Sequence, residues 1–140
     1  MKKNIFKIAA TIIFISLISC NASKNKKSEN KKMLATNYIV EKINTNIELK
    51  VKPSLIFNLD ENKVSGFAGC NRFNGNFIKE GNTIKFNQII STKMYCTNMK
   101  IEKSFFNLLS NTVKYKILDG KLLLLDKKDS TLAILIENVK

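Results

Sequence analysis

Two cysteine-containing segments in the middle of the chain restrict its fold more than any other feature of the sequence. Residues 66–77 read GFAGCNRFNGNF and residues 90–96 read ISTKMYC, so Cys70 and Cys96 stand 26 residues apart. The glycines of the first segment allow a positive φ angle or a close backbone approach, and its asparagines favour turns. We therefore expect a tight turn between strands that fixes the positions of Cys70 and Arg72.

The two cysteines allow three interpretations. Outside the cytoplasm, a disulfide between Cys70 and Cys96 is the default, and it would stabilise the fold by about 3–4 kcal/mol. Reduced thiols buried in the core are the second interpretation. A redox-active pair is the third. It lacks a CxxC motif, although Cys96 precedes a predicted helix, a position that can activate a thiol.

The first twenty residues have the pattern of a bacterial lipoprotein signal. A basic start is followed by an apolar run at residues 8–18, whereas a membrane-spanning helix needs about twenty apolar residues. Leu17, Ser19 and Cys20 fit the −3, −1 and +1 positions of a lipobox. We expect residues 1–19 to be removed and Cys20 to be lipidated, so that acyl chains attach the protein to the membrane.

The next segment, NASKNKKSENKK, lacks large apolar side chains. Residues 20–32 are therefore predicted to be the lipidated cysteine and a flexible basic tether. Attraction to anionic lipid headgroups is the alternative role for its lysines. Asn21, in place of Asp, follows the cysteine and favours the outer membrane as the location. Residues 33–140 then form one domain, which carries 16 basic and 10 acidic residues.

Composition excludes several classes of function. The sequence contains no histidine, which rules out Ser-His-Asp triads, Cys–His dyads and histidine-ligated metal sites. Two domain cysteines are too few for a Cys₄ zinc site, and no phosphate-binding loop is present. The basic residues of the domain form no cluster of the kind that binds nucleic acid. We expect a protein that is not an enzyme and has no cofactor, no metal and no nucleic-acid partner.

One helix is predicted at about residues 98–110. Ile101, Phe105, Leu108 and Leu109 recur with helical spacing and form one apolar stripe. Thr97 or Asn98 is expected to cap the helix, and Glu102 lies favourably near its first turn.

The other apolar segments are short and separated by turns, including the hairpin signal Asp119-Gly120. The leucine run at 122–125 indicates a strand buried on both faces. Residues 46–51 either extend the first strand or begin another, and 89–92 form a short extended piece. We therefore predict an α+β fold, a mainly antiparallel, curled and barrel-like sheet with the helix packed on it. The predicted strands are 37–44, 55–59, 64–68, 75–78, 83–86, 113–118, 121–126 and 132–136.

These segments in this order resemble the META/HslJ family (DUF306). The family pattern combines G-x-x-GCN-x-x-x-G, ST-x-M-x-C, an E-x-x-F-x-x-x-L helix and a late L-x-L strand, and matches run from about Tyr38 to Ile136. Tyr38 stands where the family usually has Trp. The resemblance implies an exported or membrane-attached bacterial protein linked to heat shock, envelope stress and antibiotic tolerance, without an established catalytic site. The matching signature residues are Gly69, Cys70, Asn71, Gly75, Ser91, Thr92, Met94 and Cys96.

Three functions stay open at this point. The first is a monomeric, non-enzymatic module of the cell envelope that presents a surface to an unknown envelope protein or small ligand. The second is a thiol/disulfide redox protein that uses Cys70 and Cys96, and the third is a carrier of small hydrophobic ligands. The polar residues of the two motifs either form the presented surface or only satisfy backbone groups in the turn. These candidates are Asn71, Arg72, Asn74, Ser91, Thr92 and Lys93.

Overall fold

The computed structural model describes residues 37–97 and 99–139, which form eight strands and one helix. Each strand pairs antiparallel with the next in the chain, and β1 also pairs with β8, so the sheet closes in a ring. This confirms the predicted curled antiparallel sheet with a single helix. The elements are β1 (Asn37–Ile43), β2 (Ser54–Asn58), β3 (Lys63–Phe67), β4 (Arg72–Glu80), β5 (Thr83–Ser91), α1 (Lys100–Asn111), β6 (Lys114–Leu118), β7 (Lys121–Leu125) and β8 (Thr131–Glu137).

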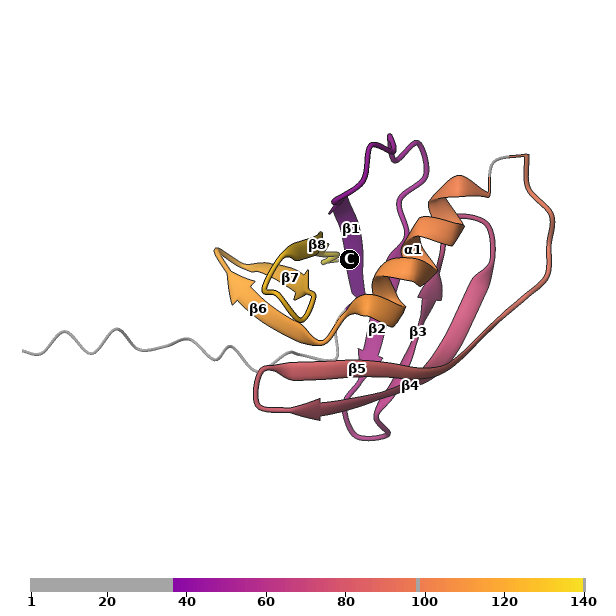
Figure 1. Cartoon of the computed structure of the whole chain (residues 1–140). Coiled ribbons are helices and arrows are strands. Elements are labelled where there is room, and N and C mark those ends of the chain that lie inside the picture. The colour runs from indigo at the N-terminus through magenta and orange to yellow at the C-terminus, as the bar shows by residue number, and fades with distance from the viewer. Residues whose placement is uncertain (1–36, 98, 140) are drawn as a thin grey trace, which may run out of the picture.

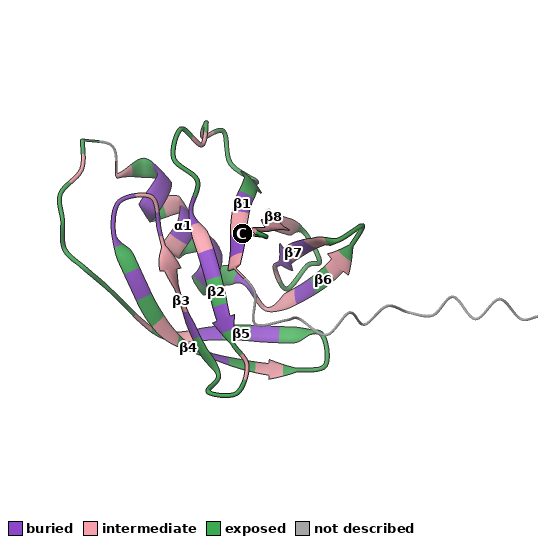
Figure 2. Ribbon diagram, turned by 180° about the vertical axis from the view of Figure 1, so that it is seen from behind, coloured by how far each residue is buried: buried purple, intermediate pink, exposed green. Residues whose placement is uncertain are grey.

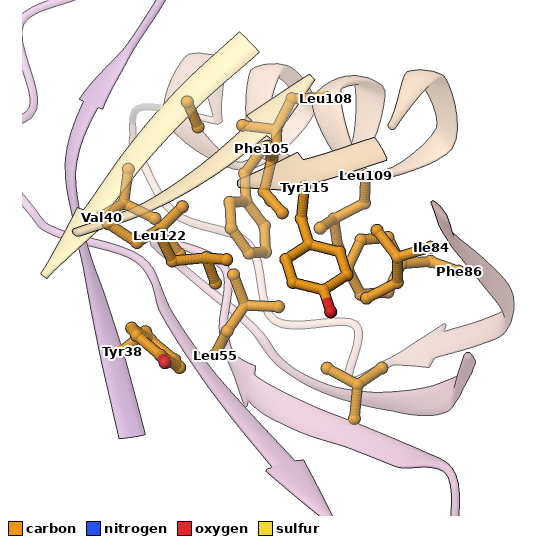
Figure 3. Packing of buried hydrophobic residues seen from close by; sticks show 14 of the residues in the cluster. Tyr38, Val40, Leu55, Ile84, Phe86, Phe105, Leu108, Leu109, Tyr115 and Leu122 are labelled. Atoms are coloured by element: carbon orange, nitrogen blue, oxygen red, sulfur yellow. The ribbon is translucent and has the colours of Figure 1, made fainter. Parts of the chain in front are cut away.

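The core fills the inside of the ring and the face of α1 that points into it. Alternate residues of the strands point inward, as the two-residue period of a strand requires. Figure 3 shows Val40, Leu55 and Leu122 from three strands meeting Phe105 and Leu108 of the helix. The predicted apolar stripe of the helix is confirmed, because all four of its residues are buried.

Several boundaries differ from the prediction. Residues 46–51 form no strand, and β2 begins only after Pro53, which has no N–H for a sheet ladder. β4 and β5 are longer than expected, because β4 starts within the glycine-rich segment and β5 includes 89–91. The leucine run of β7 is buried at three of its four positions, while Leu123 is half-buried.

The cap of the helix is not the predicted one. α1 is preceded by Met99, which makes no side-chain cap hydrogen bond, so Thr97 does not cap the helix. Asn98 lies outside the described residues, as do Cys20, the signal segment and the tether. No helix in residues 37–97 and 99–139 is long and apolar enough to cross a membrane. The helix packs against β5 (Figure 1), and Ile101 in its first turn lies next to Gly69 of the first cysteine motif.

Candidate functional site

The turn between β3 and β4 is shaped by Gly69. Its φ angle is +109°, a value that side-chain-bearing residues rarely adopt. A Cβ at this position would lie 2.8 Å from Cγ2 of Ile101, in the first turn of α1. The Ala68 N–H closes the turn by donating to the Asn71 carbonyl oxygen at 2.8 Å. The glycine therefore permits both the turn and the close approach of the helix to it.

Asn71 connects this turn to the segment that follows β5. The side chain is only 2% exposed, and its Oδ1 accepts hydrogen bonds from the Thr92 hydroxyl and the Met94 N–H, both at 2.7 Å. Its Nδ2 donates to the Met94 carbonyl oxygen at 3.1 Å. The Asn71 side chain therefore satisfies backbone groups of Met94 and is not presented at the surface.

Glu102 ties the helix to the same asparagine. Its carboxylate accepts the Asn71 backbone N–H at 2.7 Å and the Asn71 Nδ2 at 3.1 Å, and the glutamate is 7% exposed. Bonds from N–H groups to an ionised carboxylate are stronger than neutral ones. Sequence reasoning placed Glu102 near the helix start for its charge alone and missed this contact. The glutamate of the E-x-x-F pattern is the signal that could have revealed it.

Cys70 and Cys96 form a disulfide, with 6.1 Å between their Cα atoms. This confirms the disulfide interpretation over reduced core thiols. Cys70 is 3% exposed, whereas Cys96 is half-buried. The Cys70 Sγ also lies 3.6 Å from the Met94 carbonyl oxygen, which is a contact without a hydrogen bond because a disulfide sulfur carries no proton. The bond attaches the end of the post-β5 connection to the β3–β4 turn.

The other predicted surface residues are exposed and lie around the Asn71 hydrogen bonds and the disulfide. Arg72 and Asn74 are on β4, Ser91 ends β5, and Thr92 and Lys93 follow it. The Thr92 N–H donates to the Arg72 carbonyl oxygen at 3.0 Å, so the two segments stay adjacent beyond the strand pairing. The structure therefore brings the residues of both motifs together, with Asn71 beneath them.

Three apolar side chains lie at the same place: Met94, a signature residue of the sequence analysis, and Ile90 and Tyr95, which sequence reasoning did not select. Tyr95 is 89% exposed, Ile90 63% and Met94 58%. Figure 2 shows most of this connection as exposed. We call Ile90, Lys93, Met94 and Tyr95 the display surface. The sequence signal that could have revealed this surface is Tyr95, a tyrosine directly before the disulfide cysteine Cys96.

Two pockets flank α1. One has a volume of about 270 Å³ and lies between β5 and the helix, with Phe86, Ile89, Phe106 and Leu109 among its walls. The other, about 410 Å³, lies between the opposite side of α1 and the β7–β8 turn. Within residues 37–97 and 99–139, no three His, Cys, Asp or Glu side chains lie close enough to hold a metal ion. The described site thus offers exposed apolar contacts and pockets for binding.

Comparison with known proteins agrees with this geometry. The pattern of the META domain matches residues 31–138. No curated protein matches the chain at a significant level.

Solved structures with a similar fold include the NMR structure of a protein from Burkholderia xenovorans, at 19% identity and a TM-score of 0.61, covering 76% of this chain and 83% of that one. A second NMR structure has 20% identity and a TM-score of 0.54, covering 71% and 87%. A crystal structure of a DUF4847 family protein from Bacteroides vulgatus has 20% identity and a TM-score of 0.50, covering 63% and 60%. At these identities the likeness shows the fold alone.

Proposed function

The chain belongs to the META domain family, and from this membership we propose that it is a lipid-anchored, non-enzymatic module of the bacterial cell envelope. In this proposal it acts as a monomer with a stress-related role, in heat shock, envelope stress or antibiotic tolerance. Cleavage before Cys20 and acylation of that residue attach it to the membrane, with the outer membrane favoured. The basic tether links the anchor to the folded domain and keeps the domain close to the membrane surface.

The observation that carries the binding role is the display surface. Met94 is fixed to Asn71 through both its N–H and its carbonyl oxygen, and Cys96 is fixed by the disulfide. The strongly exposed Tyr95 lies between these two attachments. Tyrosine and methionine are enriched in protein interfaces, and binding costs less when such residues are held in place beforehand. We propose that this surface contacts an envelope protein.

The cysteine sulfur and the neighbouring polar groups that a thiol enzyme would use are already buried or hydrogen-bonded in the structure. The Cys70 sulfur is buried, whereas a reactive cysteine needs access to its substrate. Asn71 and Glu102, the buried polar residues beside it, are hydrogen-bonded to each other and to backbone groups. These contacts support the non-enzymatic module over the redox alternative.

Photo-crosslinking in the native envelope tests the proposal. A photoreactive phenylalanine analogue replaces Tyr95 in one variant and Leu118, a 58% exposed residue at the β6–β7 turn, in the control. We expect a discrete protein adduct from position 95 that position 118 does not give, and we expect it to weaken in a Met94→Ser background. Identical adduct patterns from the two positions would contradict the proposal.

The anchor is tested separately by fractionation. The wild-type protein is expected in the membrane fraction and the Cys20→Ala variant is expected to lose its acyl mass. Membrane association that is unchanged by Cys20→Ala, with no acyl mass on the wild-type N-terminus, would exclude the lipoprotein part of the proposal while leaving the display surface untouched.

A further inference from the structure

The ring of strands is closed by a single residue pair between β5 and β6, Thr83 with Lys114. Two backbone hydrogen bonds flank this pair, from Ile84 N–H to the Val113 carbonyl and from Tyr115 N–H to the Asn82 carbonyl. Beyond this point β5 continues to Ser91 with β4 on one side and α1 on the other. A helix cannot continue a sheet ladder, so the junction is packed only by side chains.

The pocket of about 270 Å³ lies at this junction. Four of its seven lining residues are apolar, and Figure 3 shows two of them, Phe86 and Leu109, at the edge of the core. The other three, Gln88, Ser91 and Ser110, are polar, and small-molecule sites combine apolar walls with placed polar groups of this kind. The complete lining consists of Phe86, Gln88, Ile89, Ser91, Phe106, Leu109 and Ser110.

Local backbone geometry shapes the pocket wall. The β4–β5 pairing shifts register between Asn74 and Asn76, and Gln88 has a φ angle of +51°. A bulge with a left-handed non-glycine residue is costly, and such features occur next to binding sites. Gly75 lacks the Cβ that would lie 2.5 Å from Cδ1 of Ile89. Ile89 therefore packs down on β4, which leaves the space toward the helix open.

One lysine shares the helix face that lines the pocket. The lining contains no acidic residue, and Lys103 precedes Phe106 and Ser110 with the spacing i, i+3, i+7 that places residues on one helix face. We propose that this pocket binds a small amphiphilic anion, with its apolar body between Phe86 and Phe106 and its charged end toward the serines and Lys103. A dry cavity of about 150 Å³ accommodates benzene, so this volume suits a body of roughly eight carbons.

This site is separate from the display surface, with which it shares β5 but no residue. It gives the small-ligand alternative a location, and it can be tested independently of any protein partner. The test uses the mature chain, residues 20–140 with Cys20→Ser, labelled with ¹⁵N. Octanoate is the probe and 1-octanol is its uncharged counterpart with the same chain length.

Octanoate is expected to shift the amide signals of β5 from Phe86 to Ser91 and of the last two turns of α1, and to bind more tightly than octanol. Ser110→Trp fills the pocket and is expected to weaken octanoate binding at least about tenfold, the equivalent of losing contact with about two methylenes. Asn111→Trp, on the neighbouring exposed position outside this lining, is the matched control and should bind as wild type. Lys103→Gln should reduce the preference for octanoate over octanol.

Shifts spread over other exposed apolar residues such as Val51 and Leu118, or equal binding by the Ser110→Trp and Asn111→Trp variants, would overturn the assignment of the site. Equal affinity for octanoate and octanol would overturn the assignment of an anion. Absence of any saturable shift would overturn both.

Discussion

Asn71 and Glu102 are joined by two hydrogen bonds although 31 residues separate them in the sequence. The Asn71 backbone N–H donates to Glu102 Oε2 and the Asn71 side-chain amide donates to Oε1. The same side chain bonds the connection after β5 through Met94. The asparagine of the GCN motif and the glutamate of the helix motif therefore lock the β3–β4 turn, the connection and α1 together.

Replacing Asn71 should lower the stability of the fold. Asn71→Ala removes the side-chain partners of Glu102 Oε1 and of the Met94 N–H and carbonyl groups, while the backbone N–H at position 71 still donates to Glu102 Oε2. We expect the free energy of unfolding to fall by about 3 kcal/mol. Asn74→Ala, in the same motif but exposed, should change it by less than about 0.5 kcal/mol. Urea unfolding followed by circular dichroism measures both. Equal effects of the two substitutions would show that Asn71 does not hold the β3–β4 turn, the segment after β5 and α1 together.

Gly69 should tolerate no side chain. Gly69→Ala imposes a strained φ angle and a 2.8 Å approach to Ile101, and we expect a loss of about 2–4 kcal/mol. Gly81→Ala is the control, because Gly81 also has a positive φ angle but no atom lies within 4 Å of the added Cβ. Its loss should be about 1 kcal/mol. Thermal unfolding compares them, and a smaller loss for Gly69 than for Gly81 would mean that the helix does not pack on the turn as described.

The amide of Met94 should exchange slowly with solvent although its side chain is exposed. Its N–H donates to the buried Asn71 Oδ1, whereas the neighbouring Tyr95 is strongly exposed. We expect the Met94 amide to exchange roughly a hundredfold more slowly than the Tyr95 amide, after correction for intrinsic rates. Hydrogen exchange by NMR measures this ratio, and Asn71→Ala should abolish it. A ratio near one in the wild type would mean that the display surface is not fixed.

One carboxyl group gives a defined dependence on pH. The hydrogen bond from Lys114 at 2.9 Å, with the charge of that lysine, lowers the pKa of Asp129 below its usual value of 3.8. The associated stabilisation is present above the unfolded-state pKa and is lost as the pH falls through the lower folded-state pKa. NMR titration should show Asp129 titrating below pH 3.8, and Lys114→Met should raise its pKa toward that value. An unchanged pKa in the variant would contradict this pairing.

The sequence predicted the elements of the fold better than their boundaries. The apolar stripe of α1 and the Asp119-Gly120 hairpin depend on local patterns, and both are present, with positive φ angles at the two turn residues. Residues 46–51 have some strand character but form none. Whether they pair is decided by neighbouring strands, which local patterns do not describe.

The sequence identified the residues of the site but only some of the contacts that they make. The disulfide between Cys70 and Cys96 was the favoured outcome because a protein outside the cytoplasm meets oxidising conditions, and the structure contains it. The inward placement of Asn71 could not be read from its spacing, since its four side-chain contacts come from segments 21 to 31 residues away. The pocket beside β5 depends on the short β5–β6 pairing, a tertiary feature without a sequence signal.

The most direct test of the structural role of the cysteine pair is its reduction potential. The protein is equilibrated across a glutathione redox series, alkylated and weighed intact. The disulfide lies beside the buried, hydrogen-bonded Asn71, and Cys70 is itself buried. We therefore expect Cys70 and Cys96 to stay paired until the redox potential of the solution falls below about −300 mV, as structural disulfides do. Opening near −200 mV or higher would place the pair among reactive disulfides and would contradict the account of a non-enzymatic, disulfide-fixed surface.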